Sequence, residues 1–183
     1  MIVRETELLG VFDVIDEPAA DERGSFARIW CEDELRRAGI DHHCAQLSIS
    51  RSARAGTIRG LHLAVAPHEE AKLVRCVRGS IFDVAVDLRP GSPTFAKFVA
   101  RELSAASGRA LFIPPGFAHG LQTLEDDTDV LYAIDPPFVA SAARAIRYDD
   151  ATIGVPWPLP PSVVSDRDTS APTLDEFIVR GPR

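Results

Sequence analysis

The sequence predicts an all-β fold, a barrel or sandwich of short strands with a few short helices at its periphery. The chain has 183 residues, of which 45% are hydrophobic, and this is enough for one core. Its fourteen prolines and twelve glycines fall mostly between short apolar segments, which favours strands and turns over helices. We expect a single domain over residues 1–183, with its core at about 20–135 and a C-terminal arm at about 150–183.

The clearest helix comes before most of the strands. Residues 32–39 start with acidic side chains, end with basic ones and stop at a glycine. The proline-rich residues 154–161 are expected to cross the barrel as an extended arm that leads to residues 165–168. Short apolar segments predict strands at 46–50, 58–63, 72–78, 81–88, 95–102, 110–113, 120–124 and 130–134.

The strands at 72–78 and 81–88 are expected to form a tight hairpin, because only Gly79 and Ser80 separate two alternating runs. This pairing would place Lys72 opposite Asp87. One face, expected to point inward with two aspartates to offset the lysine charge, would carry Lys72, Val74, Cys76, Asp83, Ala85 and Asp87. The other face, buried against another layer, would carry Phe82, Val84, Val86 and Leu88.

The composition excludes some classes of partner. A net charge of −7 argues against a nucleic acid, although a few arginines would suffice for a small phosphorylated ligand. No apolar run approaches the ~18 residues of a membrane span, and the N-terminal residues lack the apolar segment of a signal peptide. Three cysteines without a C-x-x-C motif indicate a reduced, cytoplasmic setting.

Two segments each place a glycine, a short apolar strand and a histidine in the same order. Residues 108–119 fit the spacing G-x5-P-x-G-x2-H, and residues 56–62 fit G-x5-H. These spacings resemble the two signatures of the cupin jelly-roll barrel. A metal-binding cupin would have a further histidine where this chain has Ala64. The resemblance therefore implies a barrel whose usual metal cage is incomplete, and we expect proton chemistry by side chains with no metal and no cofactor.

A wider set of motifs resembles the dTDP-4-dehydrorhamnose 3,5-epimerase family of nucleotide-sugar epimerases. The matching stretches are residues 21–26, 59–62, 70–75, 83–89, 92–95, 113–120, 165–168 and 171–172. The family's substrate is a 6-deoxy-4-ketohexose linked to a nucleotide diphosphate. Its ketone acidifies the C–H bonds at C3 and C5, so epimerisation needs a base on one face, an acid on the other and a donor at the enolate oxygen.

The resemblance implies that His62 is the base and Asp168 its partner. A carboxylate bonded to one ring nitrogen sets the tautomer and raises the basicity of the other. Arg59 lies three residues before His62, so a regular strand would put the two on opposite faces. We expect a bulge at Gly60 that brings both side chains into the site.

By the same resemblance, Lys72 lies near the C4 keto oxygen and Tyr132 protonates the carbanion from the opposite face. His119 is expected to support the site. The residues expected to bind substrate are Arg23, Phe26, Gln46, Arg59, His119, Phe138 and Arg167. Arginines suit a diphosphate because a guanidinium binds it with two parallel hydrogen bonds. In the family the Arg23–Phe26 segment crosses a dimer interface, which implies a homodimer.

Some positions depart from the family pattern and keep alternatives open. Phe138 stands where many members have a second tyrosine, and Arg28 where a glutamate is common. The enzyme could therefore epimerise one carbon only, or act on another nucleotide-linked ketosugar. Two further alternatives are a metal-dependent cupin using His62, Glu69 and His119, and a sugar-binding cupin without catalysis.

Overall fold

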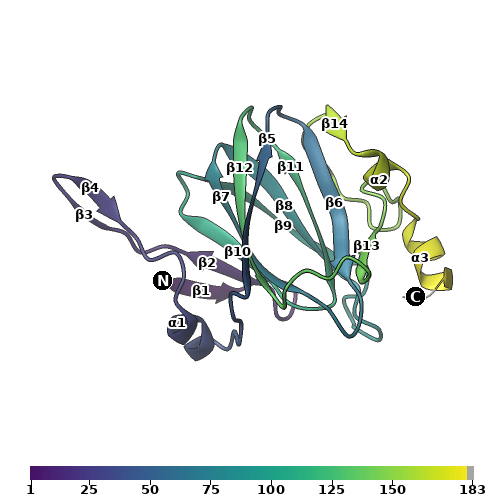
Figure 1. The fold of residues 1–183 in the computed structure, drawn as a ribbon, viewed down its shortest axis with the longest axis horizontal. Helices are drawn as coiled ribbons and strands as arrows, with labels where there is room; N and C mark the ends of the chain where they lie inside the picture. The colour runs from purple at the N-terminus through teal and green to yellow at the C-terminus, as the bar shows by residue number, and fades with distance from the viewer. Residues whose placement is uncertain (181–183) are drawn as a thin grey trace.

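The structure, a computed structural model, describes residues 1–180 and confirms the all-β class. Two sheets face each other as in a jelly roll without joining into one closed sheet over these residues (Figure 1). The first sheet has the order β1 (Ile2–Glu5), β2 (Phe12–Ile15), β10 (Arg109–Ile113), β7 (Ala71–Arg78), β12 (Thr128–Asp135) and β5 (Gln46–Ser52). The second has the order β13 (Ala143–Ala145), β6 (Thr57–Ala64), β11 (Phe117–Thr123), β8 (Ser80–Asp87) and β9 (Phe98–Ser104), with β14 (Val163–Val164) parallel to β6.

Three short helices lie outside the sheets. The predicted helix is confirmed as α1 (Glu32–Arg37), which has acidic residues in its first turn and packs the fully buried Leu35 inward. The helices α2 (Asp166–Thr169) and α3 (Leu174–Arg180) follow the proline-rich segment. None of the helices in the described part of the chain is long and apolar enough to cross a membrane.

The apolar residues divide into layers on either side of the second sheet. The layer between the two sheets includes Val74, Cys76, Ala85, Leu111 and Val130. On the outer face of the second sheet, Leu61, Val84, Val86, Ile153 and Leu174 form a separate cluster, against which Trp157 and Phe177 pack. Burial of this outer face holds the C-terminal segment, including α3, against the barrel.

The predicted hairpin of residues 72–78 and 81–88 is wrong. These segments are β7 and β8, but β7 pairs with β10 and β12 in the first sheet, whereas β8 pairs with β11 and β9 in the second. Gly79, with φ +74°, turns the chain from one sheet to the other, and a Cβ there would lie 2.5 Å from Thr128 Oγ1. Each strand is flanked on both sides within its own sheet, so no edge remains for the expected pairing.

The expected division of faces nevertheless holds. Val74 and Ala85 lie in the layer between the sheets, and Val84 and Val86 lie in the outer cluster. Alternation along a strand depends only on the local pleat, and it is therefore independent of which strand is the neighbour.

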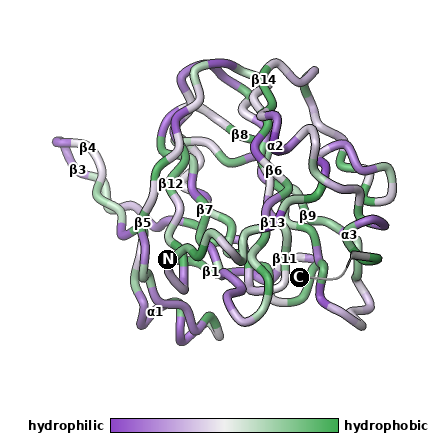
Figure 2. Tube along the Cα trace, turned by 45° about the vertical axis from the view of Figure 1, so that its right-hand side comes forward, coloured by the Kyte–Doolittle hydropathy of each residue, from purple (hydrophilic) through white to green (hydrophobic). Residues whose placement is uncertain are grey.

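A small hairpin of β3 (Ala19–Asp21) and β4 (Gly24–Phe26) projects away from the body of the molecule (Figure 1). Its tip is hydrophilic (Figure 2). Phe26 on this hairpin is 78% exposed, which is unusual for so large an apolar side chain. The described residues therefore leave most of the Phe26 ring uncovered.

Candidate active site

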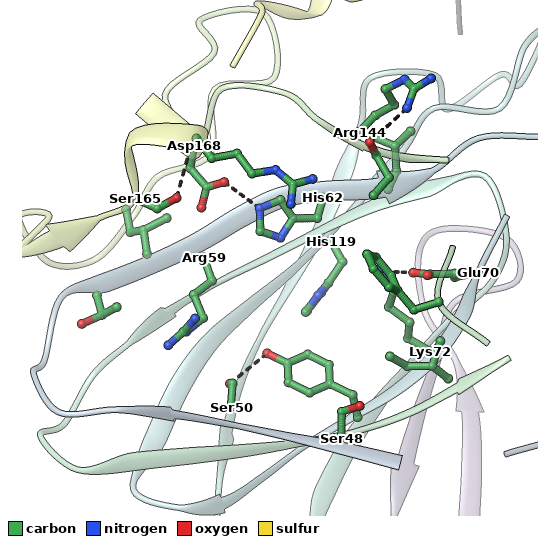
Figure 3. Close-up of a pocket in the computed structure, with 18 of the residues that line it drawn as sticks. Ser48, Ser50, Arg59, His62, Glu70, Lys72, His119, Arg144, Ser165 and Asp168 are labelled. Atoms are coloured by element: carbon green, nitrogen blue, oxygen red, sulfur yellow. Dashed lines mark hydrogen bonds and ion pairs between the residues drawn. The ribbon is translucent and has the colours of Figure 1, made fainter. Parts of the chain in front are cut away.

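A cavity of about 490 Å³ opens between the two sheets (Figure 3). The first sheet contributes to its wall from β5, β7 and β12, and the second from β6, β11 and β13. The C-terminal segment closes one side through α2. Many of the lining residues have charged or hydrogen-bonding side chains, among them Ser48, Ser50, Arg59, His62, Glu70, Lys72, His119, Tyr132, Arg144, Ser165, Arg167 and Asp168.

The expected bulge is present on β6. Two residues separate Arg59 from His62 on this strand, whereas a single residue, Gly120, separates their partners on β11. Gly60 has φ +139°, and a Cβ at this position would lie 2.5 Å from the Cα of Gly120. The close approach of these two glycines shifts the alternation by one residue, so that Arg59 and His62 both line the cavity.

His62 is hydrogen-bonded to Asp168 across the top of the cavity (Figure 3). The His62 Nε2 to Asp168 Oδ1 distance is 2.7 Å, and the backbone N–H of Gly60 donates to the other carboxylate oxygen at 3.3 Å. Burial acts to raise the pKa of Asp168, but the hydrogen bonds with His62 and Gly60 outweigh it, so the pKa lies below its ordinary value. An ionised Asp168 can stabilise the imidazolium that forms when His62 takes a proton.

Tyr132 lines the opposite wall, on β12 of the first sheet. Its hydroxyl lies 3.3 Å from Ser50 Oγ, and its ring stands edge-on to that of His119, with 5.9 Å between centroids. Burial raises the pKa of Tyr132 to about 12, against the smaller opposing effect of the Ser50 hydrogen bond. The phenol therefore keeps its proton at neutral pH and can donate it.

A second histidine–aspartate pair lies deeper in the barrel. His119 Nε2 is 2.7 Å from Oδ1 of Asp83, and the side chains are 7% and 0% exposed. Because His119 also contacts Tyr132, this pair holds one wall of the cavity in place.

Lys72 reaches the cavity from β7, but its charge partner differs from the expected one. Its Nζ lies 3.1 Å from Oε2 of Glu70, instead of facing Asp83 and Asp87. Asp87 accepts hydrogen bonds from the Arg89 guanidinium and from nearby hydroxyls. We missed Glu70 as a site residue, although its spacing from Lys72, two residues along an extended segment, predicts the same side of the chain.

The sequence of the chain matches the model of a known protein family. The family model described as dTDP-4-dehydrorhamnose 3,5-epimerase matches residues 5–176. The chain belongs to this family.

Relatives of the chain agree with this assignment. A dTDP-4-dehydrorhamnose 3,5-epimerase of Sinorhizobium fredii is 44% identical over 160 residues, or 87% of this chain and 82% of that protein. A dTDP-4-dehydrorhamnose 3-epimerase of Streptomyces niveus is 33% identical over 96% of this chain and 85% of that protein. The crystal structure of the Bacillus anthracis 3,5-epimerase with TDP and PPi bound is 37% identical, with a TM-score of 0.92 over 94% of this chain and 99% of that chain. The chain is thus an isomerase-family member of jelly-roll architecture.

The residues expected to bind substrate differ in where they lie relative to the cavity. Arg167 and Phe138 line the cavity. Gln46 lies behind Phe138, and its side-chain oxygen accepts a hydrogen bond from the Phe138 N–H at 3.0 Å. Arg23, whose side chain is 84% exposed, and Phe26 lie on the projecting hairpin and do not line the cavity of their own chain.

Arg144 is a cavity residue that we also missed. It lies on β13, a three-residue strand at the edge of the second sheet that pairs with β6. Its guanidinium donates to the carbonyls of Ser141 and Ala143, which holds it beside the cavity. So short an edge strand carries no pattern that could have indicated it.

The alternative metal cage of His62, Glu69 and His119 is not assembled. Both histidines direct Nε2 to aspartates, and Glu69 lines a different cavity, between the second sheet and α3. Within residues 1–180, no three His, Cys, Asp or Glu side chains are grouped so as to hold a metal ion.

Proposed function

We propose that this chain epimerises C3 and C5 of a dTDP-4-keto-6-deoxyhexose through an enolate, without a cofactor. The observation that carries the proposal is that His62 and Tyr132 line one cavity from opposite sheets. A sugar ring held between the sheets would have a base over one face and a phenol over the other. Lys72 lines the same cavity from β7.

In the proposed reaction, Nδ1 of His62 removes the proton from a carbon next to the ketone, because Nε2 is bonded to Asp168. The electron pair moves onto the ketone oxygen, where the ammonium group of Lys72 stabilises the negative charge. Tyr132 then donates its proton to the carbon from the opposite face, which inverts the centre. General acid–base groups contribute about 10²–10⁴ in rate, and a preorganised donor at the oxyanion about 3–4 kcal/mol.

The nucleotide diphosphate would take the cationic part of the cavity. Arg59, Arg144 and Arg167 line it, and their guanidinium groups match phosphate oxygens. Arg59 is further held by Ser52 Oγ, to which its Nε donates at 3.2 Å.

We propose a homodimer of single-domain chains in which the β3–β4 hairpin of each chain completes the other chain's site. Arg23 and Phe26 are exposed and do not line the cavity of their own chain. In the partner's site, Arg23 would bind the diphosphate and Phe26 would pack on the base of the nucleotide. The three cysteines are free thiols, which fits a reducing compartment, and we place the reaction in the cytoplasm.

The hairpin exchange can be tested by complementation. His62→Ala and Arg23→Ala chains are each expected to be inactive, but a mixed dimer pairs the intact His62 of one chain with the intact Arg23 of the other. Co-refolding the two variants should restore about a quarter of wild-type activity, since half of the dimers are mixed and each has one intact site. No recovery in verified mixed dimers would place both residues in one chain's site.

Epimerisation at a single carbon is the second candidate. The similarity to a 3-epimerase and the phenylalanine at position 138, where a hydroxyl is missing, favour it. The two outcomes differ in which carbon exchanges its proton.

Solvent deuterium exchange tests the function. A panel of nucleotide-linked 4-ketosugars is incubated with the protein in D₂O and followed by proton NMR. Deuterium at both C3 and C5 of the dTDP-linked 6-deoxy sugar supports the first candidate, and deuterium at one carbon supports the second. Exchange at neither carbon of any sugar would refute the epimerase proposal and favour a binding protein.

A further inference from the structure

We propose that Glu70 binds the C3 hydroxyl of the sugar and so makes the site selective for 3-hydroxy over 3-deoxy ketosugars. The inference rests on the proposed function, because it uses the position of the ketone beside Lys72. It concerns a cavity residue to which the reaction itself assigns no step.

The Glu70 carboxylate is buried and half paired. Its side chain is 7% exposed, and Oε2 lies 3.1 Å from Nζ of Lys72. The other oxygen, Oε1, is fully buried and accepts no hydrogen bond from any described residue. Glu70 lines the cavity on the same side as Lys72, away from His62 and Asp168 (Figure 3).

One other carboxylate among residues 1–180 buries an oxygen without a partner. That residue is Asp83, whose Oδ2 lies behind His119 and does not line the cavity. Glu70 differs from Asp83 in that its side chain lines the cavity.

The chemistry of a carboxylate selects the ligand group. An ionised carboxylate has only acceptor sites, and leaving one of them buried and unpaired is costly. Phosphate and ketone oxygens are also acceptors, so they cannot fill this position. The hexose hydroxyls are the donors of the substrate nearest the ketone, and one of them would give Glu70 its missing hydrogen bond.

Geometry then selects the hydroxyl. In the proposed complex the C4 ketone oxygen lies at Nζ of Lys72. The Oε2 atom of Glu70 is 3.1 Å from the same Nζ, so the Glu70 carboxylate would lie next to the C4 ketone. The groups next to C4 are the C3 hydroxyl and, on the other side, C5 with its methyl group. Only the C3 side offers a hydrogen-bond donor. Glu70 would therefore fix the orientation of the sugar ring and discriminate against sugars that lack the C3 hydroxyl.

The test measures binding in a His62→Ala background, so that bound ketosugars are not converted. The probes are dTDP-4-keto-6-deoxyglucose and its 3-deoxy counterpart, titrated by calorimetry. With Glu70 intact we expect the 3-hydroxy sugar to bind at least tenfold tighter, as for a hydrogen bond to a charged group. With Glu70→Ala added, the preference should fall to about onefold.

Two further variants serve as controls. Glu70→Gln keeps the volume and should reduce the preference to a few-fold, which gives a second readout if the alanine variant does not fold. Glu69→Ala removes the neighbouring glutamate, which lines a different cavity, and should leave the preference unchanged.

Each outcome decides the proposal. A tenfold preference that survives Glu70→Ala and Glu70→Gln would refute it, as would an equal loss of affinity for both sugars, which would make Glu70 a positioning residue for Lys72. Failure of the 3-hydroxy sugar to bind would also refute it. Deuterium exchange at C5 of the 3-deoxy sugar by the wild-type protein does not involve this contact, and it tests the epimerase function separately.

Discussion

The histidines of two histidine–aspartate pairs lie on neighbouring strands, and one of them is much more exposed than the other. His62 and His119 are register partners on β6 and β11, and each has Nε2 2.7 Å from an aspartate oxygen. The His62 side chain is 37% exposed and that of His119 only 7%. Since the pairing distance is the same, the exposure of the imidazole is the difference that favours our proposal of His62 as the base and His119 as a supporting residue.

The two pairs also differ in where the carboxylate comes from. Asp83 belongs to β8, which pairs with β11 directly, so the buried pair forms as the second sheet forms. Asp168 lies on α2, 106 residues after His62, and depends on docking of the C-terminal segment. The exposed pair is therefore assembled by a long-range contact, and the buried pair by the sheet itself.

The largest expected effect comes from replacing each of the two histidines by alanine. His62→Ala should lower kcat for C–H exchange by about 10³-fold, because it removes the base, whereas His119→Ala should lower it by about tenfold. Stability should follow the opposite order. His119→Ala leaves the buried Asp83 without its partner and should cost about 3 kcal/mol, whereas Asp168 keeps its hydrogen bond from the Gly60 N–H when His62 is removed.

Single-turnover kinetics of the two variants measure the loss of rate, and denaturant unfolding measures the loss of stability. Equal losses of rate would mean that exposure does not distinguish the pairs.

The next effect concerns the aspartates. Asp168→Asn should lower kcat by about 10²-fold with little change in KM, because the imidazolium loses its counter-charge and its tautomer is no longer set. Asp83→Asn should change kcat by less than tenfold. Steady-state kinetics at saturating substrate measure this, and a larger effect from Asp83→Asn would reverse our assignment of the base.

A smaller effect concerns the phenol of Tyr132, whose ring lies beside that of His119. Burial raises the pKa of Tyr132 to about 12, so it should remain protonated where an ordinary tyrosine, with a pKa near 10, is ionised. The chain has two tyrosines, and Tyr148→Phe leaves Tyr132 as the only chromophore of this kind. Ultraviolet titration of that variant should show little tyrosinate up to pH 11, and a midpoint near 10 would contradict the burial argument.

The smallest effect is the pH dependence of stability. Asp168 has a lowered pKa in the folded protein, so its contribution is present above the unfolded value of about 3.9 and is lost as the pH falls through the folded value. Asp168→Asn should therefore be less stable than wild type by about 1–2 kcal/mol at pH 6, and the difference should shrink in acid. Urea unfolding at pH 6 and pH 3 measures it, and a difference that grows in acid would contradict the sign.

Local spacing in the sequence predicted much of the catalytic side of the fold. The three-residue separation of Arg59 and His62 required a bulge, and the glycine between them, which alone can approach Gly120 so closely, showed where it lies. Such a prediction succeeds because strand alternation and glycine geometry are properties of a few neighbouring residues.

Strand pairing could not be predicted in the same way. Gly79 between alternating runs is as compatible with a corner between two sheets as with a hairpin, and the choice depends on distant strands such as β12. Arg144 likewise enters the cavity through an edge strand too short for any pattern. The role that we propose for the projecting hairpin involves a second chain, which the sequence of one chain does not position.

If His62 and Tyr132 act on opposite faces of one sugar ring, the product that Tyr132→Phe forms in D₂O should reveal it through its stereochemistry. With the base intact and the opposite acid removed, deuterium should enter the carbon next to the ketone while its configuration is retained. Inversion by Tyr132→Phe at the wild-type ratio of inversion to exchange would show that another group returns the proton, and would contradict the account.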